Sequence, residues 1–365
     1  MHNSEKTKDA LKAADSAILL ERPVDVQRAS KAWRKSDVFG LDTEFVRERT
    51  YFANLGLIQI SDGQTVWLVD PMDANTLNPI KTFFEDNSTT KLFHTPSEDL
   101  EVLLNTTGAL PDPMIDTQAA CALLGKPLQM GYHTAVEWLF GIELAKEQTR
   151  SNWCARPLKK AQLHYAALDV CLLPEMWEIL RSRLVAEDRL DWLLEDCQRQ
   201  VDRARTPVHP DELWQKVRGI GRLDGPSLAT LQALVAWRED EARRKNRPRG
   251  FIIKDDVLRI IAEVKPGHPD DLTELDGLHP KAARRYGEIV CQIVEQVLIE
   301  GIELDPIEHL TNRQKTLLGR LRNKTKEIAD RLGLEPTVLA TKRELEQLVR
   351  THPGTDVPER LSGWL

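Results

Sequence analysis

Two carboxylates lie within an apolar segment that has the length and composition of a buried β-strand. Residues 38–46 read Val-Phe-Gly-Leu-Asp-Thr-Glu-Phe-Val, and Asp42 and Glu44 are the charged side chains in this run. Because side chains alternate between the two faces of a strand, both carboxylates point to the same face. Neighbouring carboxylates in an apolar environment repel each other unless a cation lies between them. The segment therefore predicts a sheet with a divalent metal site on one face.

Length and composition limit the classes of protein to which this chain can belong. Its 365 residues are enough for two or three domains, and 41% hydrophobic with 29% charged residues is typical of a globular protein. Residues 1–15 are polar and lack the apolar core of a secretion signal, and no apolar run reaches the roughly 18 residues of a membrane span. The net charge of −7 argues against indiscriminate nucleic-acid binding. An odd number of scattered cysteines indicates reduced thiols and a cytoplasmic protein: Cys121, Cys154, Cys171, Cys197 and Cys291.

The first two hundred residues alternate between strand and helix patterns. A helix is expected around 24–33, and the sequence Ser61-Asp-Gly-Gln64 predicts a hairpin turn. From residue 116 to about 200 the pattern is mainly helical. This order predicts an α/β fold with a mixed sheet and helices on its faces. The expected strands are 16–20, 38–46, 55–61 and 65–69.

The rest of the chain is predicted to be helical and to contain an internal repeat. Two prolines, Pro207 and Pro210, mark residues 202–210 as a linker. Beyond it, apolar residues recur at an offset of 87 residues, which indicates two copies of one helical module that meet near Asp305-Pro306. The matching pairs are Leu231 and Leu318, Leu234 and Leu321, Ala242 and Ala329, Ile252 and Leu339, Leu258 and Leu345, and Ile261 and Leu348.

A third carboxylate is expected near the edge of the sheet. Leu92-Phe93 has the character of a strand end and Pro96-Ser97 of a helix start, which puts Glu98 and Asp99 in the first helical turn. Open α/β sheets place their sites at this edge. A favourable charge at a helix N-terminus, worth ~0.3–1 kcal/mol, is the simpler explanation for an acidic residue here. Position alone does not separate Glu98 from Asp99.

A fourth carboxylate lies in a segment with the pattern of a closely packed helix. The helix is expected to begin near Lys159, with Pro157 close to its start. Tyr165 and Asp169 are four positions apart, so they project from one face of this helix, one turn apart. An Asp among small and apolar neighbours is costly to bury without a partner. An exposed Asp169 is an equally good interpretation of these residues alone.

Asp42, Glu44, Asp99 and Asp169, with Tyr165 one turn before the last, resemble the DEDDy branch of the Asp-Glu-Asp-Asp exonucleases. In particular they resemble the ribonuclease D family of bacterial 3′-5′ exoribonucleases. The resemblance selects Asp99 over Glu98, covers roughly residues 15–365, and departs from the family at Thr95-Pro96, where small residues such as Ala-Gly are expected. Its motifs are Leu41-Asp-Thr-Glu-Phe45, Phe93-His-Thr-Pro-Ser-Glu-Asp-Leu100 and His164-Tyr-Ala-Ala-Leu-Asp-Val170, with further agreement at 57–61, 67–71, 115–117 and 155–158.

The resemblance implies a ribonuclease H-like α/β exonuclease domain with a mixed sheet, followed by two all-α HRDC domains. A flexible N-terminal tail would cover residues 1–14 and the exonuclease domain residues 15–204. The first HRDC domain would cover 208–298 and an HRDC-like second domain 303–365. The protein would act as a monomer on RNA with a free 3′ end, and tRNA precursors are the family expectation.

The resemblance also implies hydrolysis with two divalent ions, Mg²⁺ or Mn²⁺, that releases 5′-mononucleotides. Oxygen ligands, with no His/Cys cluster in the sequence, favour these ions over zinc. Asp42, Glu44 and Asp169 would hold the metal that activates water. Asp42 would also bridge to the second metal, which Asp99 would reach directly or through water. Tyr165 would orient the attacking water, since a phenol with a pKa of about 10 is a poor base unless the metals lower it.

Further residues are candidates for RNA contact, each with a structural alternative. Phe45 and Tyr51 could stack on terminal bases, although Phe45 could equally be a core residue. Arg156 could contact a phosphate, or Ala155-Arg-Pro157 could simply be a helix entrance that is stabilised elsewhere. Asp116 is interpreted as a helix N-cap. The basic run that ends at Lys254 predicts a phosphate-binding surface, with a solvated helix end as the alternative. Its candidates are Arg243, Arg244, Lys245, Arg247 and Arg249.

Two other functions fit parts of the sequence. A DNA 3′-5′ exonuclease would carry the same four acids, because nothing in the motifs separates ribose from deoxyribose. The paired repeats, and a sequence without a phosphate-binding Gly-x-x-x-x-Gly-Lys motif, favour RNA. A non-catalytic nucleic-acid-binding scaffold should lack at least one metal ligand, whereas this chain keeps all four.

Overall fold

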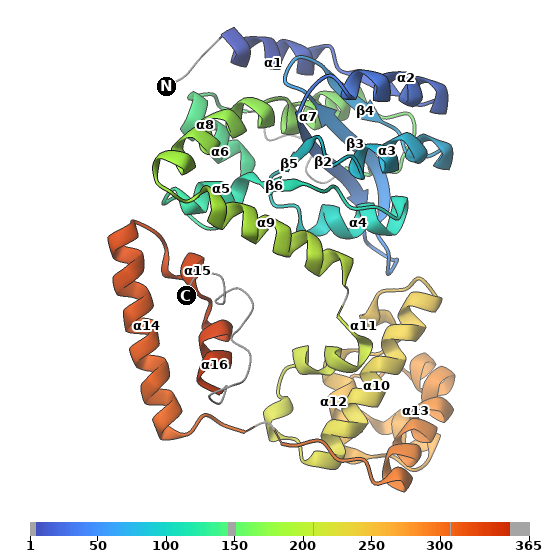
Figure 1. Ribbon diagram of the computed structural model, residues 1–365. Coiled ribbons are helices and arrows are strands. Elements are labelled where there is room, and N and C mark those ends of the chain that lie inside the picture. Colours follow the sequence, from blue (N-terminus) through green and yellow to red (C-terminus); the bar gives the residue numbers. More distant parts are fainter. Residues whose placement is uncertain (1–4, 145–150, 207, 307, 351–365) are drawn as a thin grey trace. The chain divides into compact units, whose positions relative to one another are not determined.

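The computed structural model of the chain describes residues 5–144, 151–206, 208–306 and 308–350, shown as ribbons in Figure 1. They fall into two compact units. Unit 1 comprises the residues up to 46, 54–206 and those from 311 onward, and unit 2 comprises 47–53 and 207–310. The predicted domain boundaries stay predictions. Among the described helices, none is long and apolar enough to cross a membrane.

Unit 1 contains one mixed sheet, as the alternating pattern predicts. Its strands are β1 (Ile18–Leu20), β2 (Val38–Val46), β3 (Asn54–Ser61), β4 (Val66–Val69), β5 (Thr90–Phe93) and β6 (Met114–Asp116). Their order across the sheet is β1-β4-β3-β2-β5-β6. β2 lies inside the sheet, antiparallel to β3 and parallel to β5, so the strand with the two acids is supported on both edges.

Helices cover both faces of this sheet. α7 (Lys160–Cys171) and α8 (Leu173–Ala186) lie on one side, and α4 (Ser97–Thr107) and α9 (Leu190–Arg205) on the other (Figure 1). The remaining helices of unit 1 are α1 (Glu5–Asp15), α2 (Pro23–Trp33), η1 (Ala74–Thr76), α3 (Leu77–Phe84), α5 (Thr117–Leu123), α6 (Tyr132–Phe140), α14 (Asn312–Leu332), α15 (Pro336–Leu339) and α16 (Lys342–Arg350).

A glycine sets the distance between β2 and these helices. A Cβ atom on Gly40 would lie 2.7 Å from the carbonyl oxygen of Val170 and 2.7 Å from Cβ of Leu173. Only glycine therefore lets the end of α7 and the start of α8 pack on this strand. The close approach brings Asp169, the neighbour of Val170, to the strand that carries Asp42.

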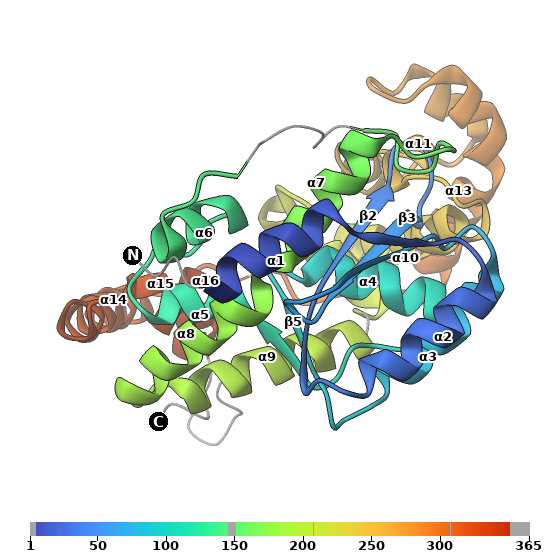
Figure 2. The ribbon, with the colours of Figure 1, turned by 90° about the horizontal axis from the view of Figure 1, so that it is seen from above.

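The N-terminal segment differs from the predicted flexible tail. Residues 1–4 lie outside the described residues, but Glu5–Asp15 form α1, which lies along α7 (Figure 2). Ala10, Ala13 and Ala14 are buried, because small side chains at helical spacing let the two helices approach closely. Thr7 donates a hydrogen bond to Glu175 in α8 at 2.9 Å.

The helices α14–α16 belong to unit 1 although they follow unit 2 in the chain. The buried Arg189 side chain donates hydrogen bonds to the carbonyl oxygens of Leu123, at 2.6 Å, and Leu332, at 2.7 Å. This guanidinium therefore connects the end of α5 to the end of α14.

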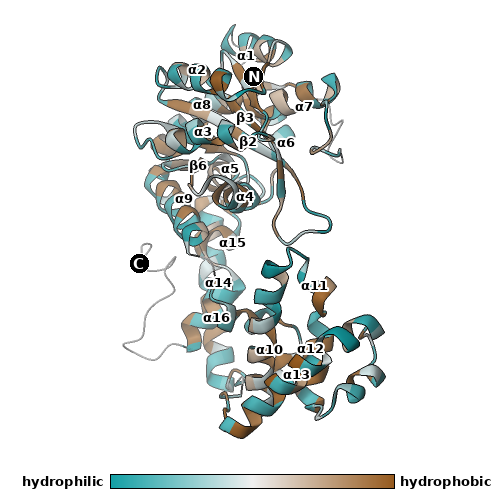
Figure 3. Cartoon of the chain, turned by 90° about the vertical axis from the view of Figure 1, so that its right-hand side faces the viewer, coloured by the Kyte–Doolittle hydropathy of each residue, from teal (hydrophilic) through white to brown (hydrophobic). Residues whose placement is uncertain are grey.

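Unit 2 is a helical bundle with one apolar core. Its helices are η2 (Pro210–Lys216), η3 (Ile220–Arg222), α10 (Gly225–Arg244), α11 (Arg249–Ile252), α12 (Asp255–Val264), η4 (Pro269–Glu274) and α13 (Pro280–Glu300). Leu231, Leu258 and Val290 come from three of these helices and are fully buried in that core. Figure 3 shows the apolar residues of α10, α12 and α13 in brown. The segment 47–53 joins this unit through Tyr51, which packs against the core.

The predicted repeat is visible in the helix boundaries. α14, α15 and α16 begin at Asn312, Pro336 and Lys342, each 87 residues after the first residue of α10, α11 and α12. The matched residues of the first copy are buried, and so are four of the six in the second: Leu318, Ala329, Leu339 and Leu345. Residues 307 and 351–365 of the predicted second HRDC-like domain lie outside the described residues.

Candidate active site

Three acidic side chains from two elements of unit 1 converge. Asp42 and Glu44 project from one face of β2, and Asp169 reaches them from α7. One carboxylate oxygen of each lies within 4.8 Å of those of the other two. The structure thus brings together three of the four predicted ligands.

This crowding opposes ionisation of the three carboxyl groups. Burial, followed by the negative charges of Asp169 and Asp99, raises the pKa of Glu44 from 4.5 to about 9. Burial also raises the pKa of Asp42 well above its usual value, with further contributions from its acidic neighbours. The pKa of Asp169 is raised by burial as well. A bound cation would reverse this preference and favour the charged forms.

Asp99, the fourth predicted ligand, has a different partner. It is buried in the first turn of α4 and accepts a hydrogen bond from the Thr43 hydroxyl. Thr43 lies between Asp42 and Glu44 in β2, so its side chain points to the opposite face of the sheet. Burial raises the pKa of Asp99 to about 6. Its charge still contributes to the raised pKa of Asp42.

A glutamine beside Asp42 is a residue that the sequence did not single out. Gln59 of β3 is directly opposite Asp42 in the strand pairing, so the two side chains share a face of the sheet. Gln59 is 0% exposed, and among the described residues neither Oε1 nor Nε2 has a hydrogen-bond partner. The sequence feature that could have singled out Gln59 is its place as a polar residue at the centre of the strand segment Leu57-Ile-Gln-Ile-Ser61.

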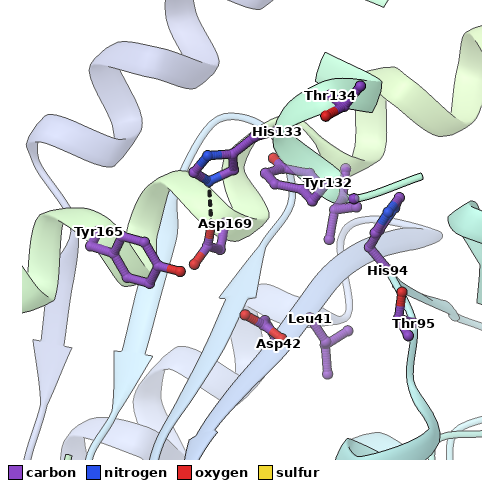
Figure 4. A pocket seen from close by; sticks show the side chains of 11 residues that line it. Leu41, Asp42, His94, Thr95, Tyr132, His133, Thr134, Tyr165 and Asp169 are labelled. Carbon is purple, nitrogen blue, oxygen red and sulfur yellow. Dashed lines mark hydrogen bonds and ion pairs between the residues drawn. The ribbon is translucent and has the colours of Figure 1, made fainter. Parts of the chain in front are cut away.

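A cavity of about 530 Å³ adjoins the carboxylates (Figure 4). Asp42 and Asp169 both line the cavity and point toward each other. The hydroxyl of Tyr165 points toward Asp169. Tyr165 is one turn before Asp169 on α7, as the spacing predicts. The cavity is also lined by Leu41, His94, Thr95, Gly131, Tyr132, His133, Thr134 and Leu173.

The Tyr165 phenol is held in its neutral form. Burial, and then the negative charges of Asp169, Glu44 and Asp42, raise the pKa of Tyr165 above its usual value of 10. Its ring packs 6.2 Å from the Trp153 ring and 6.5 Å from the His133 ring, measured between centroids. A neutral phenol fixed in this way can donate a hydrogen bond but is a poor base.

His133 is a second residue that the sequence did not single out. It follows the first residue of α6, and its Nε2 lies 3.3 Å from Oδ1 of Asp169. This contact is the dashed line in Figure 4. The hydrogen bond lowers the pKa of Asp169 against the larger effect of burial. The two residues are 36 positions apart, and no motif in the sequence connects them.

Comparison with known proteins assigns the chain to a family. Residues 19–185 match the 3′-5′ exonuclease family, and residues 227–294 match the HRDC domain. Ribonuclease D of Pseudomonas paraeruginosa is 36% identical over 341 residues, which cover 92% of this chain and 90% of the relative. The chain belongs to the ribonuclease D family. Ribonuclease D of Escherichia coli strain K12 is 34% identical over 346 residues, which cover 92% of this chain and 91% of that protein.

A solved structure of the family has the same fold. The crystal structure of Escherichia coli RNase D, described as an exoribonuclease involved in structured RNA processing, has a TM-score of 0.88 at 32% identity and covers 95% of each chain. Together with the family matches, it confirms the predicted fold class, a mixed-sheet exonuclease domain with a helical HRDC domain. The HRDC match lies within the first predicted copy, and the second copy stays a prediction.

Three other predicted residues of this ribonuclease D family member have defined places in unit 1. Asp116 is the N-cap of α5, as interpreted from the sequence, and accepts a hydrogen bond from the backbone N–H of Gln118 at 2.9 Å. Arg156 donates to the carboxylate of Asp70 at 2.5 and 2.9 Å and to the backbone carbonyl oxygens of Trp153 and Gly56. Phe45 is half-buried at the end of β2. Contact of Arg156 or Phe45 with RNA stays a prediction.

The predicted RNA-contact residues of unit 2 are mostly engaged in ion pairs. Glu239 is 1% exposed and accepts hydrogen bonds from Tyr51, Arg243 and Arg249. Burial raises the pKa of Glu239, but these hydrogen bonds and positive charges outweigh it and hold the pKa at about 2. Arg244 and Lys245 pair with Glu241 at 2.6 and 2.5 Å, whereas Arg247 is exposed.

The oxygen ligands around Asp42 fit a divalent cation. Burial and the mutual repulsion of the convergent carboxyl groups raise the pKa values of Asp42 and Glu44, and a bound cation would offset both effects. Gln59 adds a buried amide whose oxygen and nitrogen have no partner in the described chain. Carboxylate and amide oxygens are ligands of hard cations such as Mg²⁺. The site is therefore compatible with the divalent metals of its exonuclease family.

Proposed function

We propose that this chain is a metal-dependent 3′-5′ exoribonuclease that shortens tRNA precursors and releases 5′-mononucleotides. Membership of the ribonuclease D family establishes the enzyme class, a 3′-5′ exoribonuclease, as the sequence motifs predicted. The tRNA substrate, a monomeric state and a cytoplasmic location are parts of the proposal. Five free thiols, four of them buried, support a reducing compartment.

The convergence of Asp42, Glu44 and Asp169 beside a cavity is the observation that carries this proposal. These residues, which would hold one ion, keep their carboxylates on one face where the scissile phosphate would lie. Asp42 would be shared with a second ion, and Asp99 would approach that ion from the first turn of α4. Two Mg²⁺ or Mn²⁺ ions would supply a nucleophile at neutral pH and charge stabilisation at phosphorus.

Tyr165 would orient the attacking water by hydrogen bonding. Without metal ions, burial and the nearby carboxylates raise the pKa of the phenol, which keeps the proton on the hydroxyl at neutral pH and lets the group donate a hydrogen bond. His133 would hold the Asp169 carboxylate in position from the opposite side. Substrate contacts are proposed for Phe45 and for the basic residues of unit 2. Among these basic residues, the exposed Arg247 is the one least engaged in ion pairs.

Matched oligonucleotides test the proposal. A 20-nucleotide single-stranded RNA and the corresponding DNA, each with a 5′ label, are incubated with the full chain and Mg²⁺. We expect stepwise shortening of the RNA from its 3′ end and release of 5′-mononucleotides. Asp42→Asn and Asp169→Asn should remove this activity and keep the fold. Faster digestion of the DNA would favour the DNA exonuclease, and normal turnover in either variant would contradict the assigned site.

A further inference from the structure

Gln59 lies at the centre of the sheet, on the face that carries the acidic residues. In the strand pairing it is opposite Asp42 of β2 on one side and opposite Leu68 of β4 on the other. Side chains of directly opposite residues share a face of the sheet, with Cβ atoms about 5 Å apart. The Gln59 amide therefore lies between a carboxyl group and a leucine, beneath α7, which packs on β2, β3 and β4.

The amide is unfavourable for folding at this place. Gln59 is 0% exposed, and among the described residues neither Oε1 nor Nε2 has a hydrogen-bond partner. Its neighbours on the same face include Leu57 and Leu68, both buried. Burying an amide without hydrogen bonds costs free energy, and an apolar side chain of the same shape would avoid this cost. Fold stability alone therefore does not explain a glutamine here.

Two other acids of the site show what is missing at Asp42. Nε2 of His133 lies 3.3 Å from the Asp169 carboxylate, and Asp99 accepts a hydrogen bond from the Thr43 hydroxyl. By contrast, no side chain of the described chain donates a hydrogen bond to Asp42, which has only the backbone N–H of Thr43. Carboxylates that bind metals are usually hydrogen-bonded by a neighbouring group, which fixes their orientation.

Gln59 is placed to supply this missing donor. Asp42 lines the cavity (Figure 4), whereas Gln59 is not among the described residues that line it. The amide therefore approaches the Asp42 carboxylate from the β3 side and leaves the cavity side free for a cation. Other polar groups on this face are less suitable partners. Glu44 is diagonal to Gln59, at roughly 7–8 Å, and Oγ of Ser61 already accepts from the backbone N–H of Gly63 at 3.1 Å.

We propose that Gln59 is a positioning residue of the metal site: with a divalent cation bound beside Asp42, Nε2–H of Gln59 donates to the Asp42 carboxylate and holds it toward the cavity. The inference rests on the proposed function, because it takes a divalent cation as the ligand of Asp42. It deepens that function by giving a role to a buried amide that weakens the metal-free fold, as residues at functional sites often do.

Opposite effects on metal-free stability and on metal binding test this role. Gln59→Met replaces the amide by an apolar side chain of similar length in the full chain. In EDTA, we expect the midpoint of thermal unfolding to rise by about 2–4 °C, because polar groups without partners are removed from the core. In calorimetric titration, the affinity for Mn²⁺ should fall about 10- to 100-fold, the usual effect of removing a group that orients a metal ligand.

Gln162→Met is the matched control. Gln162 of α7 is also buried, at 5% exposed, but its Oε1 accepts a hydrogen bond from the backbone N–H of Lys159 at 3.0 Å. This variant should lower the unfolding midpoint and leave the Mn²⁺ affinity close to the parent value. A lower midpoint in Gln59→Met would show that the amide stabilises the fold, and an unchanged Mn²⁺ affinity would show that it does not support the ligands. Either result would overturn the proposal.

Nuclear magnetic resonance of the Gln59 amide identifies the group that acts. Its Nε2 signals are those missing from Gln59→Met. With saturating Mg²⁺, one of the two Nε2 protons should move downfield more than the other, because only one is donated to Asp42. Equal shifts of both protons would indicate a contact through Oε1 and would overturn the proposal.

Hydrolysis of RNA by the parent chain is measured in the same Mn²⁺ buffer, which separates this inference from the proposed function. A parent that binds Mn²⁺ and hydrolyses RNA, with equal Mn²⁺ affinity in Gln59→Met, would overturn this inference alone. A parent that binds no Mn²⁺ would overturn the proposed function as well.

Discussion

Glu44 carries the clearest electrostatic consequence of the site, because its folded-state pKa of about 9 lies far above its usual value of 4.5. Between these values the folded chain keeps a proton that the unfolded chain releases. The stabilisation is therefore fully present below pH 4.5 and is lost as the pH rises through about 9.

We predict that the metal-free chain becomes less stable between pH 5 and pH 9, and that Glu44→Gln removes part of this dependence. Mg²⁺ or Mn²⁺ should raise the midpoint of thermal unfolding more at high pH, because the ligands must be deprotonated to bind. Thermal unfolding in EDTA and in MnCl₂ at each pH measures both effects. An identical pH dependence in Glu44→Gln would show that Glu44 ionises normally.

Tyr165→Phe keeps the ring packing and removes only the hydroxyl. We predict that kcat falls about 10- to 100-fold, the loss of one hydrogen bond to a charged or reacting group, with little change in KM. Steady-state kinetics on a short RNA measure the two constants. A loss expressed in KM alone would assign Tyr165 to binding of the substrate.

His133→Ala removes the hydrogen bond to Asp169. Residues that orient metal ligands typically contribute 10- to 100-fold in metal affinity, so we predict a loss in this range. Calorimetric titration with Mn²⁺ measures it without turnover. His164→Ala is the matched control, because His164 lies next to Tyr165 on α7 but faces Asp15 at 3.5 Å. An unchanged Mn²⁺ affinity in His133→Ala would leave this histidine with no role at the carboxylates.

Local periodicity explains which site residues were predictable. Strand alternation placed Asp42 and Glu44 on one face, and helical spacing placed Tyr165 and Asp169 together. The same alternation puts Thr43 on the other face, but its hydrogen bond to Asp99 also depends on where α4 packs against the sheet. Gln59 and His133 depend on strand register and on the position of α6, which no local pattern specifies.

At the scale of elements, strand and helix positions were predicted well where apolar periodicity was continuous. Expected strands at 38–46 and 55–61 correspond to β2 and β3 within one residue. The N-terminal helix was missed because its buried face consists of alanines, which add little to an apolar pattern. The loop before α4 was recognised as unusual at Thr95-Pro96, but its backbone conformation was not predictable.

Thr95 adopts a left-handed conformation, with φ of 70°. This region costs a residue with a Cβ roughly 1–2 kcal/mol, and glycine avoids the cost while losing ~0.5–1 kcal/mol in chain entropy. We predict that Thr95→Gly stabilises unit 1 by about 0.5–1 kcal/mol in urea unfolding. Thr134→Gly, in the helical part of the same cavity wall, should destabilise by about 1 kcal/mol. Destabilisation by Thr95→Gly would show that the threonine side chain stabilises this turn.

At the scale of the whole molecule, the repeat of 87 residues predicted helix positions but not the unit to which each copy belongs. The first copy forms the core of unit 2, and the second is grouped with the sheet of unit 1. This grouping depends on contacts such as Arg189 with Leu332, which join residues 143 positions apart. A repeat contains no information about such contacts.

Removal of residues 311–365 tests whether the second copy stabilises unit 1. Arg189 is 8% exposed, and it would lose the acceptor at Leu332 and keep the one at Leu123. We predict that the unfolding free energy of unit 1 falls by about 1 kcal/mol or more, the scale of one hydrogen bond to a charged group. Arg189→Ala should be more damaging in the full chain than in the shortened one, with a coupling of about 1 kcal/mol in the double-mutant cycle. Calorimetry of the four proteins measures it, and additive losses would mean that α14 and Arg189 stabilise the unit independently.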